Sequence, residues 1–154
     1  MEPLAAQVIK KFAHEGWTLA TAESCSGGSL SDALTDIDGS SQVFLGGIIA
    51  YSPEAKEHLA GISEDFILSN GTISAETTTM LASQVKQIMN ATVAIAITGV
   101  AGKTTEDKPK GLVYIAIAHS AGIFVKQYFF PGTRRAIKKQ AVETALKMCL
   151  DLLS

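Results

Sequence analysis

The chain has 154 residues, of which 47% are hydrophobic and 18% are charged. This composition excludes intrinsic disorder, and the length predicts a single domain over residues 1–154. Thirteen Lys and Arg residues against fifteen Asp and Glu residues give a net charge of −2, which argues against nucleic acid as a partner.

The first residues lack the basic and apolar regions of a secretory signal, and no run approaches the roughly 18 apolar residues of a membrane span. The two cysteines, Cys25 and Cys149, have the spacing of neither a disulfide framework nor a zinc site. We therefore expect a cytoplasmic protein with reduced thiols, no metal site and no membrane partner.

Hydrophobic periodicity and turn residues predict the secondary structure. In chain order we expect a helix over 4–14, a strand over 17–22, a helix through 30–34, a strand over 43–51, a short helix from 53, a loop over 61–71, a helix over 75–90, strands over 92–97, 112–118 and 123–130, and a helix over 133–153.

The run over 92–97 is apolar without alternation, which is typical of a strand in the middle of a sheet. The last two strands are joined by a short turn and predict an antiparallel hairpin. Helices interspersed with strands indicate the α/β class, as a three-layer α/β/α sandwich with a mixed, mostly parallel sheet. Ligands of such folds usually bind beyond the carboxyl ends of the parallel strands.

Polar residues follow the first predicted strand at 23–28. Ser24, Cys25 and Ser26 there precede a helix, whose first N–H groups can hold an anion or a developing oxyanion. The turn is either part of a nucleophilic site or a structural feature in which Ser26 caps the helix and Cys25 is a small buried residue.

Two further candidates are cationic. Lys56 with Tyr51 could activate a serine without a histidine, or it is a surface lysine on a short helix. Arg134 follows Pro131-Gly132 at the start of a helix, where it either grips a phosphate or is solvated. The segment 99–104 looks like a phosphate loop, but Ile97 stands where that motif requires glycine, so we do not expect ATP or GTP hydrolysis.

Six segments, taken together and in order, resemble the CinA C-terminal-domain family of nicotinamide-nucleotide amidohydrolases over nearly the whole chain. They are TAESCSGG at 21–28, GSS at 39–41, YSPEAK at 51–56, TGVAG at 98–102, KPKG at 108–111 and FPGTR at 130–134.

The resemblance implies a nicotinamide mononucleotide deamidase of pyridine nucleotide metabolism, which forms nicotinate mononucleotide and ammonia. It also implies a three-layer sandwich with a mixed sheet, a small nucleotide as substrate and no metal or organic cofactor. Members of the family are often homo-oligomers, so a homo-oligomer is expected here.

The family's motif positions fall on eight residues of this chain: Ser24, Ser26, Ser40, Ser41, Tyr51, Lys56, Thr98 and Arg134. The resemblance implies a serine nucleophile, Ser41 or Ser24, assisted by Tyr51 and Lys56. Backbone N–H groups near Gly27 or Gly99 would stabilise the oxyanion, and Arg134 would bind phosphate. Ser26, Ser40 and Thr98 are further expected contacts of the substrate.

The chain departs from the family pattern after Gly102, where Lys103, Thr104 and Thr105 stand in a loop about two residues shorter. This change keeps open a second interpretation, a noncatalytic module that binds a pyridine nucleotide or phosphate. A third interpretation is a cysteine-dependent amidase that uses Cys25.

Overall fold

The computed structural model describes residues 2–102 and 108–153. Its elements are α1 (Leu4–Glu15), β1 (Leu19–Glu23), α2 (Ser29–Thr35), the 3-10 helix η1 (Ser40–Gln42), β2 (Phe44–Ile49), α3 (Pro53–Ala60), α4 (Glu64–Asn70), α5 (Ala75–Met89), β3 (Val93–Gly99), β4 (Leu112–His119), β5 (Gly122–Phe129) and α6 (Arg134–Leu152). The predicted departure at 103–105 lies outside the described residues.

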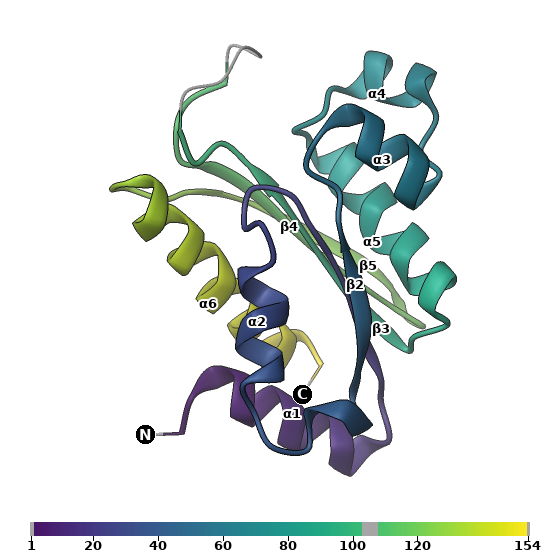
Figure 1. Ribbon diagram of the computed structural model, residues 1–154, viewed down its shortest axis with the longest axis vertical. Helices are drawn as coiled ribbons and strands as arrows, with labels where there is room; N and C mark the ends of the chain where they lie inside the picture. The colour runs from purple at the N-terminus through teal and green to yellow at the C-terminus, as the bar shows by residue number, and fades with distance from the viewer. Residues whose placement is uncertain (1, 103–107, 154) are drawn as a thin grey trace.

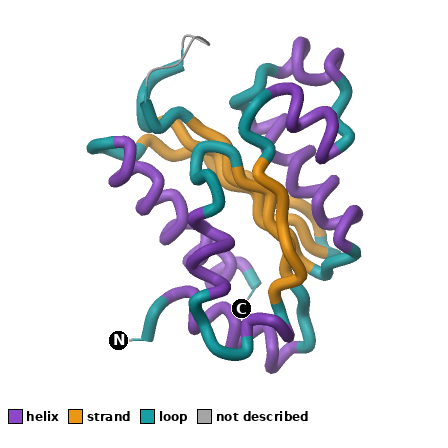
Figure 2. Tube along the Cα trace, viewed as in Figure 1, coloured by secondary structure: helices purple, strands orange, loops and turns teal. Residues whose placement is uncertain are grey.

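One sheet lies between two layers of helices (Figures 1 and 2). Helices α1, α2 and α6 cover one face, and α3, α4 and α5 cover the other (Figure 1). The expected three-layer α/β/α sandwich is therefore confirmed.

The strand order is β2-β1-β3-β4-β5. Strand β1 pairs in parallel with β2 and β3, whereas β3 with β4 and β4 with β5 pair antiparallel. The sheet is therefore mixed, and every strand except β4 runs in the same direction. Strands β4 and β5 form the expected hairpin, closed between His119 and Gly122.

The fully buried strand β3 alternates in side-chain size rather than in polarity. Val93, Ile95 and Ile97 enter the core beneath α1, α2 and α6, while Ala94 and Ala96 face α5. The neighbouring strands repeat this arrangement, because the face beneath α5 also carries Ala20, Ala22, Ala116 and Ala118. These small side chains leave room for Leu81 and Val85 of α5 to fill the second core.

The expected loop over 61–71 was wrong, because the structure has α4 there. Ser63 caps this helix by accepting a hydrogen bond from the Phe66 N–H at 3.1 Å. Glu64 and Asp65 lie in the first turn, where carboxylates interact favourably with the helix dipole. The helix has seven residues and buries only Ile67, so it is too short to produce a visible helical period.

The carboxyl ends of the parallel strands β1, β2 and β3 lie at the same end of the sheet, so the segments that follow these strands are neighbours. The 3-10 helix η1 precedes β2 and therefore lies at the opposite end of the strands.

No helix within residues 2–102 and 108–153 is long and apolar enough to cross a membrane. Nor does this part of the chain group three or more His, Cys, Asp or Glu side chains as metal ligands.

Candidate active site

The segments after β1, β2 and β3 surround a cavity of about 410 Å³. The sequence-predicted residues that line it are Ser24, Tyr51, Lys56, Gly99 and Arg134. A groove of about 850 Å³ between α1, α2 and α6 shares Arg134 with this cavity. We place the candidate site in the smaller cavity, because two of its lining residues, Ser24 and Lys56, are buried and joined by a hydrogen bond between hydroxyl and amine.

Ser24 and Lys56 meet at the base of the cavity. The Lys56 Nζ lies 3.3 Å from the Ser24 Oγ, and both residues are buried, with Lys56 only 1% exposed. Lys56 Nζ also donates to the backbone carbonyls of Ala50, at 2.9 Å, and Tyr51, at 3.5 Å. These contacts hold the amine in place beside the hydroxyl.

Local structure explains how Lys56 reaches this position. Ser52 caps α3 by accepting from the Ala55 N–H at 3.0 Å, and Pro53 occupies the first turn. Because α3 begins directly after β2, its first turns stand beside the end of β1. The side chain of Lys56 therefore points into the protein rather than into solvent, which excludes the surface-lysine interpretation.

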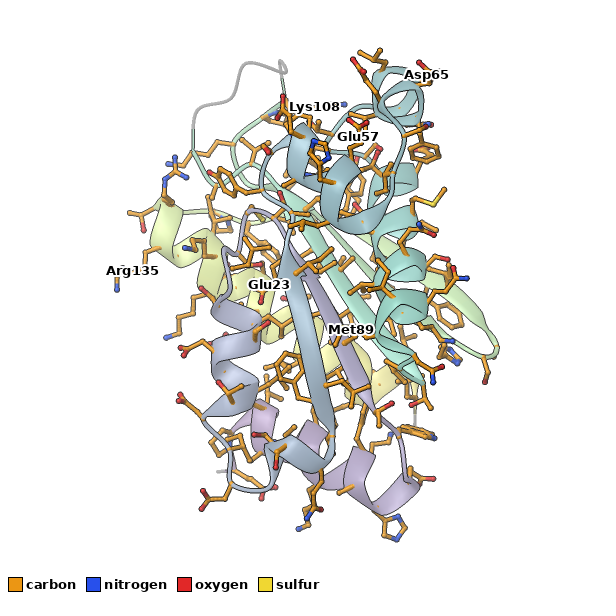
Figure 3. The ribbon with its side chains drawn as sticks, turned by 45° about the vertical axis from the view of Figure 1, so that its right-hand side comes forward. Glu23, Glu57, Asp65, Met89, Lys108 and Arg135 are labelled. Carbon is orange, nitrogen blue, oxygen red and sulfur yellow. The ribbon has the colours of Figure 1, made fainter. Side chains whose placement is uncertain are left out.

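Glu23, the last residue of β1, is a buried residue of the site that the sequence did not predict. Its carboxylate is completely buried and accepts hydrogen bonds from the N–H groups of Gly28, Leu30 and Ser31 and from the Ser31 hydroxyl, at 2.6–3.2 Å. Figure 3 shows this side chain between the strand and α2. An acidic residue between a strand and a helix start was the available sequence signal, but spacing alone did not show that its side chain turns inward.

These contacts change the role expected of the turn before α2. The Gly27 N–H donates to the Ser24 carbonyl at 3.0 Å, and the Gly28 N–H is bound by Glu23. Gly27 is also absent from the cavity lining. The structure thus assigns these two amides to the protein's own turn rather than to a substrate oxyanion.

Gly99 has a different position. The Ile97 carbonyl accepts from the Ser24 N–H at 3.0 Å, whereas the Val100 N–H donates to Leu112 of β4 at 2.8 Å. Because backbone groups alternate along a strand, the Gly99 N–H faces the side on which Ser24 follows β1. A Cβ at Gly99 would come within 2.6 Å of the Leu112 carbonyl, so glycine is required there.

Thr98 does not line the cavity. It is fully buried in β3, and its hydroxyl lies 2.7 Å from the Thr78 hydroxyl of α5. Since Thr78 donates to the Ser74 carbonyl at 2.6 Å, Thr98 is the donor of the pair. The structure therefore shows a different contact for this hydroxyl, which ties β3 to the start of α5, and the expected substrate contact of Thr98 stays a prediction.

Tyr51 and Arg134 stand at the mouth of the cavity. The hydrogen bond between Tyr51 and Lys56 involves the tyrosine's backbone carbonyl, and the Tyr51 side chain is 63% exposed. Arg134 is exposed, and a Cβ at Gly102 would overlap its guanidinium group, so that glycine leaves room for the arginine. Both side chains are available to a ligand.

The remaining predicted serines lie elsewhere. Ser40 and Ser41 belong to η1, at the opposite end of β2, whose six residues span about 20 Å. This placement corrects the expectation that they share a site with Lys56 of the same chain. Ser26 is completely buried, does not line the cavity and has an Oγ without a hydrogen-bond partner among the described residues.

Cys25 lines the cavity but is 8% exposed. Burial raises the pKa of its thiol from an ordinary value of 9.0 to about 12, although its own backbone hydrogen bond and the nearby Lys56 favour the thiolate. The thiol is therefore protonated at neutral pH, which argues against the cysteine-nucleophile interpretation.

The mixed five-stranded sandwich and a Ser–Lys pair beyond its parallel strands define the class of this protein as an α/β protein with a candidate serine-dependent site. Residues 1–153 match the family described as CinA C-terminal domain. The chain belongs to this family, and the resemblance inferred from its motifs is confirmed.

Relatives and solved structures agree with this assignment. The chain is 43% identical over 133 residues to a CinA-like protein of Koribacter versatilis, covering 85% of this chain and 32% of that protein. It is 40% identical over 141 residues to a CinA-like protein of Geobacter sulfurreducens, covering 90% and 34%. The chain thus spans about a third of the length of these curated relatives.

Similar folds have been solved. The structure of the competence/damage inducible protein CihA from Agrobacterium tumefaciens superposes with a TM-score of 0.93 at 33% identity, covering 98% of this chain and 94% of that one. A competence-damaged protein (CinA) superfamily protein from Klebsiella pneumoniae gives 0.94 at 28% identity, covering 97% and 95%.

Proposed function

We propose that this chain is a serine amidohydrolase that converts nicotinamide mononucleotide and water into nicotinate mononucleotide and ammonia. The observation that carries the proposal is the buried Ser24 Oγ, 3.3 Å from the Lys56 Nζ at the base of a cavity. Family membership supports the choice of a pyridine nucleotide as the substrate. Of the two serines that the resemblance left open, the geometry favours Ser24.

In the first half of the reaction, Ser24 Oγ attacks the carboxamide carbon. Lys56 in its neutral form accepts the hydroxyl proton as the C–O bond forms, and it then transfers that proton to the amide nitrogen. The C–N bond breaks, and ammonia leaves an ester on Ser24. In the second half, Lys56 takes a proton from water, which attacks the ester carbon, and returns the proton to Ser24.

The tetrahedral intermediates carry negative charge on the former carbonyl oxygen. The Gly99 N–H faces Ser24 from the end of β3, and we assign it as a donor to this oxygen. The donor belongs to a strand held on both sides by its neighbours, so it needs little reorganisation during the reaction.

Substrate recognition uses the two exposed side chains at the mouth. Arg134 offers a bidentate donor to the 5′-phosphate, at the N-terminus of α6. The ring of Tyr51 offers an electron-rich face to the positively charged pyridinium ring. This arrangement would place the phosphate at the rim and the carboxamide at the base.

The test measures ammonia released by the purified chain from nicotinamide mononucleotide, with nicotinamide and nicotinamide riboside as comparison substrates. We expect turnover of the mononucleotide alone at micromolar to millimolar concentrations. A Lys56→Met variant, purified identically, controls for contaminating deamidases and should be inactive.

If no ammonia appears, a calorimetric titration with nicotinamide mononucleotide separates the alternatives. Binding without turnover would replace the enzyme with the noncatalytic pyridine-nucleotide module. Absence of binding would refute both interpretations.

A further inference from the structure

A groove between α1, α2 and α6 takes part in the proposed reaction only through Arg134 at its edge. Figure 1 shows these three helices on one face of the sheet, with α2 beside α6 and α1 below both. The groove has a volume of about 850 Å³, against about 410 Å³ for the candidate active site. Pockets that hold small molecules usually measure roughly 300–1,000 Å³, so the groove is large enough for a ligand of its own.

One face of α6 forms a wall of this groove. Arg134, Lys138 and Val142 line it at every fourth position, so their side chains share one face of the helix. Lys139 and Leu146 extend the same stripe of residues. The stripe is therefore basic over the first two turns of α6 and mainly apolar after them.

The basic end of the groove adjoins the candidate active site, because Arg134 lines both. Within residues 2–102 and 108–153, none of Arg134, Lys138 and Lys139 forms an ion pair. A Cβ on Gly27 would lie 3.6 Å from the Lys138 Nζ, so this ammonium stands beside the turn that follows Ser24. Arg135 also borders the groove, but it points outward from α6 in Figure 3. The groove thus offers an anion three cations and the N-terminal end of a 19-residue helix.

The rest of the groove has the chemistry that a nucleoside requires. Its walls carry aliphatic side chains from three segments, namely Leu4 of α1, Ala33 and Ile37 of α2 and the turn after it, and Val142 and Leu146 of α6. Two carboxylates lie among them, Asp36 at the end of α2 and Glu143 on α6. A flat base can pack between aliphatic side chains, and a carboxylate can accept hydrogen bonds from ribose hydroxyls.

We propose that this groove binds a nucleoside diphosphate group, with its phosphates on Arg134, Lys138 and Lys139 and its nucleoside against the aliphatic walls. A terminal phosphate carries a charge of about −1.5 to −2 at pH 7, so one phosphate leaves three cations incompletely neutralised and a second linked phosphate completes the match. The group belongs either to a free nucleotide or to the distal half of a dinucleotide whose other half enters the candidate active site.

A free nucleotide in the groove would affect the candidate active site through Arg134. An arginine that binds the diphosphate is not available to the 5′-phosphate of a mononucleotide. A free nucleoside diphosphate should therefore raise KM for nicotinamide mononucleotide and leave kcat unchanged. This effect on turnover rests on the proposed function, whereas binding in the groove does not.

The first test is a calorimetric titration of the purified chain with ADP, with adenosine and inorganic pyrophosphate as comparison ligands. We expect ADP to bind at least about tenfold more tightly than either, because only ADP engages both the cations and the aliphatic walls. Absence of ADP binding, or pyrophosphate that binds as tightly as ADP, would overturn the proposal.

Variants of the two ends of the groove locate the bound ADP. Lys138→Gln combined with Lys139→Gln should weaken ADP binding at least about tenfold, since two charged contacts to phosphate are lost. Lys147→Gln is the matched control, because Lys147 is exposed on the same helix and does not line the groove. Ala33→Trp fills the place of the nucleoside and should reduce the affinity for ADP to that for pyrophosphate. Unchanged ADP binding in the double lysine variant would place the nucleotide elsewhere and refute the site.

Nicotinamide adenine dinucleotide distinguishes the two sources of the diphosphate. Tighter binding of the dinucleotide than of both ADP and nicotinamide mononucleotide would assign the groove to its distal half. Dinucleotide binding no tighter than that of ADP would assign the groove to a free nucleotide.

The ammonia assay then tests the connection to the candidate active site. We expect saturating ADP to raise KM for nicotinamide mononucleotide, and the double lysine variant to need at least about tenfold more ADP for the same effect. An unchanged KM would refute the shared use of Arg134. If the chain binds ADP but releases no ammonia under any condition, the groove proposal stands and the amidohydrolase proposal fails.

Discussion

Ser24 is the residue on which the proposed chemistry depends most directly. We expect Ser24→Ala to lower kcat by at least about 10³-fold, because the variant removes the hydroxyl that lies 3.3 Å from the Lys56 amine and that attacks the carboxamide in the proposed reaction. Binding of nicotinamide mononucleotide, measured by calorimetry, should change only a few-fold. Ser69→Ala is the control, because Ser69 lies on the exposed side of α4 and its loss should leave kcat unchanged.

Two results would contradict the role of Ser24. Turnover within a few-fold of the wild type would exclude it as the nucleophile. Loss of activity on alkylation of Cys25 at neutral pH, with Ser24→Ala still active, would instead restore the cysteine mechanism.

Arg134 and Arg135 form a matched pair of adjacent arginines. Arg134 lines the cavity, whereas Arg135 points outward from α6 in Figure 3. We expect Arg134→Ala to raise KM for the mononucleotide by roughly 10–100-fold with kcat little changed, since a charged hydrogen bond to phosphate is lost. Arg135→Ala should stay within about twofold, and an equal effect of both variants on KM would remove the phosphate role.

At this scale the sequence indicated the chemistry of the site better than its geometry. Lys56, Ser24, Gly99 and Arg134 were all singled out, and the structure gathers them around one cavity. The sequence could not test whether Ser41 shares a site with Lys56, because only the structure shows that Ser41 and Tyr51 lie at opposite ends of the six-residue strand β2. Glu23 was missed because a carboxylate beside a strand end looks exposed until its four donors fold around it.

The turn between β1 and α2 is the element that the buried Glu23 carboxylate organises. Each carboxylate oxygen of Glu23 accepts two of the four hydrogen bonds, so Glu23→Gln, which replaces one oxygen with an NH2 donor, should lose two of them, costing roughly 3 kcal/mol and lowering the Tm by about 6–12 °C. Thermal unfolding measures this cost, with Glu57→Gln as the control, because Glu57 is an exposed glutamate on α3.

A positioning role for Glu23 predicts more than a loss of stability. At a temperature where both variants are fully folded, Glu23→Gln should lower kcat about tenfold or more while KM for the mononucleotide stays unchanged, because the turn that carries Ser24 loses its anchor. Full kcat at that temperature would reduce Glu23 to a purely structural residue.

Elements with a strong local signal were predicted correctly, and weak ones were not. The apolar run of β3 and the capped, amphipathic α5 have signals that extend over many residues. Helix α4 has seven residues and a single buried side chain, so its formation depends on packing that a sequence pattern does not display. The alternation of large and small side chains along β3 can be read from the sequence, but the sequence does not show that α5 packs against the face that carries the alanines.

At the scale of the whole molecule, both cysteines lie in the same core, between the sheet and the α1, α2 and α6 layer. Burial raises the pKa of each thiol from 9.0 to about 12 in the folded protein. In the unfolded chain the thiols ionise near their ordinary value. Between about pH 9 and pH 12 the folded state therefore binds more protons than the unfolded state.

The free energy of unfolding must then fall as pH rises through this range, by at most about 1.4 kcal/mol per pH unit for each thiol. The stability that depends on the protonated thiols is fully present below about pH 8. Denaturant titrations between pH 7.5 and about pH 10.5 measure the slope. Cys149→Ala creates a small cavity that lowers stability equally at every pH, but it should remove one thiol's share of the slope. If the free energy of unfolding has the same pH dependence in the variant and in the wild type, Cys149 ionises as readily in the folded core as in the unfolded chain.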